Sequence, residues 1–237
     1  MLSLFIGVCA SNLFALLLVL IRPKLFKVKL YRPMLINFVW SILPMIIVGI
    51  TLTVFVECLL VYSSVGQDWA WYLSVAVLIV GFFTWLVFLP NAGYLITELN
   101  LNHRTVDKKE TPVDFDIIAV LALSMSGVVN TVANIFVVNI LLGTIVSPEN
   151  VYSFFHEELS IIASILFYVL VSVGIYFGRN IRLNSWDIVR PTTLIKKIVS
   201  HFSAEHTKKN FLVLIVCYTI FFFLAHCIII YPLVSVN

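Results

Sequence analysis

Six long apolar runs, separated by short polar stretches, dominate the pattern of hydrophobic and polar positions along the chain. We place them at residues 2–21, 34–60, 70–92, 116–146, 159–178 and 211–235. Each is long enough to cross the roughly 30 Å hydrocarbon core of a bilayer at about 1.5 Å per residue. The pattern predicts an all-α, polytopic membrane helix bundle of about six transmembrane helices, a single transmembrane domain over residues 1–237.

Two of the runs depart from a plain spanning helix. The third contains Pro90 and Gly93, which predict a bend or an interruption near one end of the span. The fourth would reach about 46 Å as one helix, so it must tilt, break or extend beyond the bilayer. Its polar residues fall on one helical face, at Ser124, Gly127, Asn130, Thr131 and Asn134. Such a stripe favours hydrogen bonds between helices, with the lining of a polar cavity as the alternative.

A shorter pattern follows Pro191, where Thr192 and Thr193 are typical of a helix start. The apolar residues that follow share one face: Leu194, Ile195, Ile198, Val199 and Phe202. The opposite face carries Lys196, Lys197 and His201. We expect a cytoplasmic amphipathic helix lying at the membrane interface, with a solvated linker as the alternative.

All 15 Lys and Arg residues lie between the apolar runs, within residues 22–33, 98–114 and 179–210. The connections at 61–69 and 147–158 contain none. Because cytoplasmic loops are enriched in Lys and Arg, this pattern predicts both termini on the extracellular side. It also predicts anionic lipid head groups at the cytoplasmic face as partners.

Composition restricts the function classes. The chain is 61% hydrophobic and 11% charged, with a mean hydropathy of +1.06, which excludes an ordinary soluble domain. Its basic residues flank membrane spans without a recognition motif, so nucleic acid is not an expected partner. We find no P-loop, metalloprotease or nucleophile-elbow motif, and the sequence predicts no catalytic residue, cofactor or metal.

The predicted topology brings polar residues of three spans to one level on the cytoplasmic side. The third span supplies Asn91, Tyr94 and Glu98, and the fourth supplies Asp116. The fifth ends in Arg179, Arg182, Asn184, Ser185, Trp186 and Asp187. Glu98, Asp116 and Asp187 are candidate partners of the two arginines, whose planar guanidinium groups suit carboxylate or phosphate. Asp114 and Asp116 also fit the N-cap and first turn of the fourth helix.

The same segments, FLPNAGYLITEL, PVDFD and GIYFGRNIRLNSWD, resemble the bacterial integral-membrane family catalogued as domain-of-unknown-function family 1361. The resemblance covers about residues 60–235, and its last motif is the most specific. Two positions depart from the family pattern: Gly93 replaces a second proline and Glu98 replaces an aspartate. The resemblance implies a multi-pass protein of the bacterial cytoplasmic membrane and implies no activity.

The sequence therefore leaves three function classes open. A structural or accessory membrane component with a membrane protein partner is favoured. The alternatives are a transporter of a small anionic solute and an enzyme acting on a lipid-linked substrate at the inner leaflet. Elsewhere, His226 favours hydrogen bonding between helices, and a bridge between Cys9 and Cys58 stays open.

Overall fold

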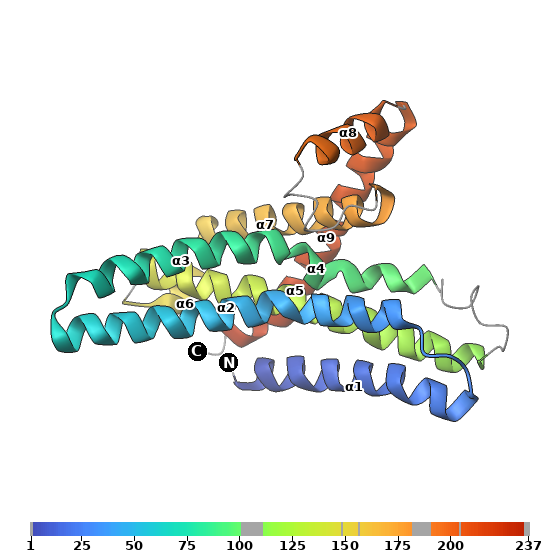
Figure 1. The fold of residues 1–237 in the computed structure, drawn as a ribbon, viewed down its shortest axis with the longest axis horizontal. Coiled ribbons are helices and arrows are strands. Elements are labelled where there is room, and N and C mark those ends of the chain that lie inside the picture. The colour runs from blue at the N-terminus through green and yellow to red at the C-terminus, as the bar shows by residue number, and fades with distance from the viewer. Residues whose placement is uncertain are drawn as a thin grey trace.

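Six helices long and apolar enough to cross a membrane follow the long axis of the computed structural model (Figure 1). The structure describes residues 2–100, 111–147, 149–155, 157–181, 191–203 and 205–234. The candidate spans are Leu2–Phe26, Arg32–Val65, Asp68–Leu99, Val113–Val146, Glu158–Ile181 and His206–Val234. They confirm the all-α bundle of six spans, and the described residues contain no strand.

The helices are labelled as in Figure 1. In chain order they are α1 (Leu2–Phe26), α2 (Arg32–Val65), α3 (Asp68–Phe88), α4 (Pro90–Gly93), η1 (Tyr94–Asn100), α5 (Val113–Val146), α6 (Val151–Phe154), α7 (Glu158–Tyr176), η3 (Phe177–Ile181), α8 (Pro191–Phe202) and α9 (Glu205–Val234). The short η1 is a 3-10 helix and η3 is a π-helical turn.

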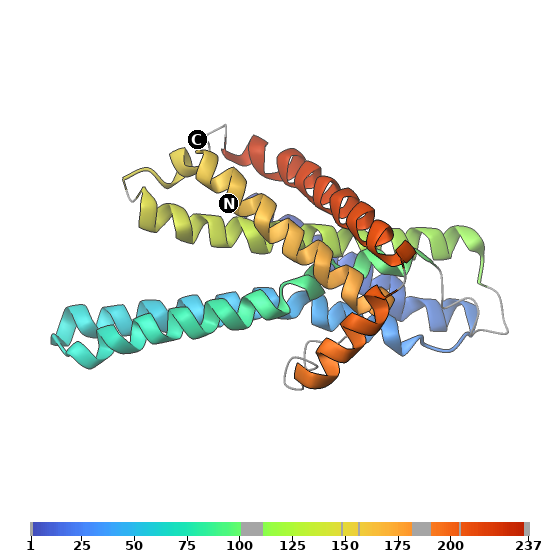
Figure 2. The same cartoon turned by 90° about the horizontal axis from the view of Figure 1, so that it is seen from above.

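Helices α2 and α3 form a hairpin that diverges from α5, α7 and α9 toward its tip (Figure 2). At the tip, Gly66 ends α2 in the left-handed region at φ 67°, and its N–H donates to the Tyr62 carbonyl. Further along, a Cβ on Gly81 would lie 2.2 Å from Thr51 Oγ1. Glycine therefore permits both the tight turn and the close contact of the two helices.

Helix α5 is the most buried of the six spans and runs for 34 residues without a break. Its length of about 51 Å exceeds the 40–45 Å of a bilayer with its head groups. A tilt of about 30° brings it within that thickness, and such a tilt is ordinary for a membrane helix. Of the three outcomes expected from sequence, the break does not occur.

The third span is interrupted where Pro90 and Gly93 predict it. Helix α3 ends at Phe88, a turn follows at Leu89, and the chain continues as α4 and η1. We call α4 and η1 together the break segment (residues 90–100). It is wedged between α5 and α7, where a Cβ on Gly174 would lie 2.2 Å from Pro90 Cβ and one on Gly127 2.7 Å from Leu95 Cβ.

The predicted amphipathic helix is present as α8. Its Phe202 ring stacks on Tyr176 with ring centroids 6.4 Å apart, and His201 Nε2 lies 2.9 Å from the Tyr176 hydroxyl. Ile195 and Val199 are exposed, as a helix on a membrane surface requires. Its position on the inner leaflet stays a prediction.

Candidate functional site

Half of the residues predicted for the cytoplasmic polar cluster lie in described parts of the structure. Asn91 is in α4, Tyr94 and Glu98 are in η1, Asp116 is in α5 and Arg179 is in η3. The other five, Arg182, Asn184, Ser185, Trp186 and Asp187, lie outside the described residues. Asp116 belongs to one group and Glu98 with Arg179 to another, while the Tyr94 ring lies against Gly178, the residue before Arg179.

The first group is a buried ion pair that the sequence did not predict. Arg22 Nε of α1 lies 3.0 Å from Asp116 Oδ1 of α5, with the two side chains 5% and 1% exposed. Thr111 Oγ1 donates to the second carboxylate oxygen. The described cation beside Asp116 is thus Arg22 of α1, and the pairing of Asp116 with Arg182 falls outside the described residues.

Two other expectations, for Arg22 and for Asp114, are also corrected. Arg22 was counted among the head-group charges that follow the first span, yet it is buried within α1. Asp114 was a candidate N-cap, yet α5 begins at Val113 after Pro112, and Asp114 and Asp116 both lie in the first turn. Asp116 is thus held by tertiary contacts as well as by its favourable place at a helix N-terminus.

The second group surrounds Glu98 in η1. Asn37 Nδ2 of α2 donates to Glu98 Oε1 at 2.6 Å, and Glu98 is buried. Arg179 is close enough to attract the Glu98 carboxylate, and its Nη1 donates to the Thr97 carbonyl at 3.4 Å. The structure therefore brings Glu98 and Arg179 to one place, with an amide from α2 as the close hydrogen-bond donor.

A layer of amides lies deeper in the bundle. Asn12 Nδ2 of α1 donates to Asn130 Oδ1 at 2.6 Å, and Asn130 Nδ2 lies 3.0 Å from both Asn12 Oδ1 and Ser41 Oγ. Trp85 Nε1 donates to Asn134 Oδ1 at 3.0 Å. The amide layer (Asn12, Ser41, Asn130, Asn134 and Trp85) thus joins α1, α2, α3 and α5. These contacts confirm the expectation of hydrogen bonding between helices.

An apolar layer lies between the amide layer and the Arg22–Asp116 pair along α1 and α5. Its buried side chains are Ala15, Val19, Met34, Phe38, Leu95, Val120 and Leu123. Val19 lies one helical turn from Arg22, and Val120 lies one turn from Asp116. Ser41 lies about one turn from Phe38 in the opposite direction. Hydrocarbon therefore separates the ion pair from the amide layer along α1 and α5, whereas on α2 Asn37, which binds Glu98, lies only one turn from Ser41.

Side chains from three other elements donate hydrogen bonds to backbone carbonyl groups of the break segment. Ser41 of α2 donates to the Ala92 carbonyl at 2.8 Å, and Ser124 of α5 donates to the Leu95 carbonyl at 3.2 Å. The Arg179 contact with Thr97 is the third. A proline break removes helical hydrogen bonds, and these side chains replace some of them in a region without bulk water.

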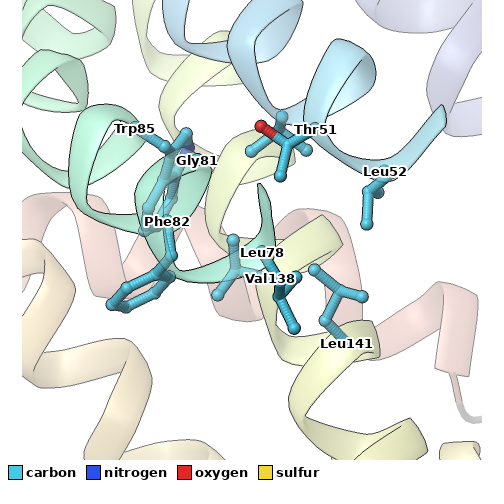
Figure 3. A pocket seen from close by; sticks show the side chains of 9 residues that line it. Thr51, Leu52, Leu78, Gly81, Phe82, Trp85, Val138 and Leu141 are labelled. Atoms are coloured by element: carbon cyan, nitrogen blue, oxygen red, sulfur yellow. The ribbon is translucent and has the colours of Figure 1, made fainter. Parts of the chain in front are cut away.

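An apolar pocket of about 30 Å³ lies where the α2–α3 hairpin leaves α5 (Figure 3). Thr51, Gly81 and Trp85 line it from the hairpin, and Val138 and Leu141 line it from α5. Its walls offer no charged group to a ligand.

Two remaining expectations concern residues outside these groups. His226 Nδ1 lies 2.9 Å from the Tyr168 hydroxyl, which confirms the expected hydrogen bond between helices. The four cysteines are free, so Cys9 and Cys58 form no bridge.

Sequence reasoning missed Arg22, Asn12, Asn37 and Ser41. Two signals were available. Asn12 is an amide inside an apolar run, and Arg22 is followed directly by Pro23 in a segment that continues to be helical. Neither signal identifies the partner, because Arg22 and Asp116 are 94 positions apart and Asn12 and Asn130 are 118 apart.

Comparison with known proteins adds the family. Residues 50–225 match the family described as "Protein of unknown function (DUF1361)". No curated protein and no solved structure matches the chain. The match includes the break segment, the start of α5 and the end of α7, which carry the quoted motifs. Because it covers more than half of the 237 residues, the chain belongs to this family of multi-pass membrane proteins of unknown function.

Proposed function

We propose that the chain is a structural or accessory component of the bacterial cytoplasmic membrane that binds a partner membrane protein through its α2–α3 hairpin. The observation that carries the proposal is the way the interior polar groups are used. Arg22, Asn130 and Glu98 each contact a side chain of another helix. Their contacts hold the bundle together, because each joins residues of two different elements.

The same observation weighs against the two alternatives. A transporter of small anions needs polar groups that are available to the solute, whereas Asn130 and Glu98 are engaged in hydrogen bonds with side chains of neighbouring helices. An enzyme acting on a lipid-linked substrate needs a pocket that holds Glu98 and Asp116 together. These carboxylates instead bind different partners, Asn37 and Arg22.

The hairpin is the part of the fold best placed to meet a partner. It diverges from the other spans (Figure 2), and large apolar side chains on both of its helices are exposed, including Ile50 at 60% and Val80 at 66%. The close approach of Gly81 and Thr51 keeps the two helices together as a unit. A transmembrane helix of a partner, packed by van der Waals contact, suits this surface and the apolar pocket beside it.

Photocrosslinking in native membranes tests the proposal. A photoreactive residue replaces Ile50 or Val80 on the hairpin, and the matched control replaces Leu212, which is equally exposed on α9. We expect one discrete protein adduct from the hairpin positions and none from the control. Adducts with lipid alone at all three positions would refute the accessory role, and an adduct with a second copy would replace it with self-association.

A flux assay tests the transporter alternative separately. The purified chain in liposomes should not accelerate anion exchange above protein-free vesicles. Saturable exchange that is lost in Arg179→Gln, without loss of thermal stability, would favour the transporter instead.

A further inference from the structure

A second pocket, of about 60 Å³, lies between the first turns of α7 and the last turns of α9. Ser160 and Ser164 line it from α7, and His226 lines it from α9. The remaining wall is mostly apolar and includes Phe223 and Ile230. Figure 2 shows these two helix ends side by side near the C-terminus. The pocket lies at the opposite end of α7 from Arg179.

The three polar side chains are almost fully buried and have spare hydrogen-bonding capacity. Ser160, Ser164 and His226 are 3%, 1% and 8% exposed. Ser160 Oγ makes no hydrogen bond within the described part of the chain, although it faces a pocket. Ser164 Oγ accepts from Asn139 Nδ2 at 2.7 Å, so its own hydrogen is available to an acceptor.

Burial of Tyr168 fixes the role of His226. The Tyr168 hydroxyl is completely buried, and its partner among the described residues is His226 Nδ1 at 2.9 Å. The hydroxyl must therefore donate to Nδ1, because a buried O–H without an acceptor is costly. A neutral imidazole that accepts at Nδ1 carries its hydrogen on Nε2, which makes His226 a donor. The pocket thus presents an excess of donors.

The depth of the pocket narrows the class of acceptor. Ser160 and Ser164 lie about 3 and 9 Å from the start of α7 at Glu158, at 1.5 Å per residue. The interfacial region of a bilayer is about 5–7 Å thick on each side. With Glu158 at the membrane surface, where the predicted topology places it, the donors lie at the boundary between head groups and hydrocarbon, the depth of the ester carbonyls of a glycerophospholipid.

We infer that this pocket binds the ester-linked glycerol region of a phospholipid, with the Ser160 and Ser164 hydroxyls and His226 Nε2 donating to its carbonyl oxygens. The acyl chain follows the apolar wall formed by Phe223 and Ile230. The exposed Ile161 and Tyr231 also line the pocket, so it reaches the lipid-facing surface. A donor-rich, half-apolar pocket at this depth matches the two halves of such a lipid.

The test compares two lipids that differ only in the carbonyl groups. Native mass spectrometry of the detergent-solubilised chain measures binding of a diacyl phosphatidylethanolamine and of its dialkyl ether counterpart with equal chains. We expect the ester lipid to bind about tenfold more tightly, as one or two hydrogen bonds allow. Equal affinity for the two lipids would overturn the inference, as would the absence of a bound lipid at saturating concentration.

Single substitutions test whether Ser160 and His226 cause the preference for the ester lipid. Ser160→Ala removes a hydroxyl that has no partner among the described residues, so its melting temperature should equal that of the wild type. Its ester preference should fall at least threefold, and His226→Gln should reduce it as well. The matched control is Ser63→Ala, an exposed serine bonded to its own helix backbone at Leu60. An unchanged ester preference in Ser160→Ala and His226→Gln would place the lipid elsewhere and overturn the assignment.

Discussion

Removal of either partner of the Arg22–Asp116 pair should destabilise the bundle more than any change to an exposed charge. The two side chains are 5% and 1% exposed, and the Nε–Oδ1 distance is 3.0 Å. Taking one member away leaves an uncompensated buried charge, which costs about 3–5 kcal/mol. For a chain of this size, 1 kcal/mol corresponds to about 2–4 °C. We therefore expect Arg22→Met or Asp116→Leu to lower the melting temperature by about 6–20 °C.

The double variant separates the ion pair from ordinary packing. Replacing both partners removes the stranded charge and leaves mainly the Thr111 hydroxyl without its carboxylate acceptor. That loss is about 1–3 kcal/mol, so the double variant should be more stable than either single variant. Thermal unfolding in one detergent, followed by intrinsic fluorescence or scanning calorimetry, gives the coupling energy of the cycle.

The control is Lys24→Met, two positions further along the same helix, where the cation is exposed. It should change the melting temperature by no more than about 2–4 °C, in line with the small energies of exposed charges. The reasoning is refuted if Arg22→Met behaves like Lys24→Met, or if the two single effects simply add in the double variant.

The other predictions concern helix contacts and orientation. Gly174→Ala should cost about 1–3 kcal/mol in thermal unfolding, because its Cβ would meet a proline 2.2 Å away, whereas Gly49→Ala has open space and should be neutral or slightly stabilising. Asn130→Ala should cost about 1–3 kcal/mol by the same assay because it removes the hydrogen bonds of Asn130 to Asn12 and Ser41; no loss would contradict the amide layer. Arg179→Ala should cost less than about 1 kcal/mol, since the side chain is exposed and its bond is long; a large loss would indicate stronger pairing. In a cysteine-free background, Asp68→Cys should react with an impermeant thiol reagent on intact cells; protection until permeabilisation would reverse the orientation.

Features that depend on local chemistry could be predicted from the sequence. A run of apolar residues specifies a span wherever it occurs, because lipid is its solvent. Pro90 lacks a backbone N–H and Gly93 follows it, so a break in the third span was predictable, although α2 continues through Pro44. The amide stripe of α5 was also predictable in kind, since an asparagine in lipid must find a partner.

Features that depend on distant partners could not be predicted in the same way. Arg22 and Lys24 look alike in sequence, two cations after an apolar run, yet one is buried and the other is exposed. The difference comes from the face of α1 that packs on α5, which is set by tertiary contacts. The sequence directed attention to Arg179 and Arg182 through their motif, and burial adds Arg22, which no motif marks.

The carbonyl groups of the break segment bear on whether this part of the molecule is a fixed support or a moving element. Interrupted helices in transporters use freed carbonyls to bind ions at the centre of the membrane. Here the Ala92 and Leu95 carbonyls accept from serines of α2 and α5 instead. Gly127 of α5 lies against Leu95, and Gly174 of α7 lies against Pro90. Both contacts are so close that a larger side chain at either glycine would fit only with a shift. Moving the segment would require breaking both hydrogen bonds and opening both contacts at once. Packed cores resist continuous deformation, so the break segment is better suited to joining the helices than to gating a path between them.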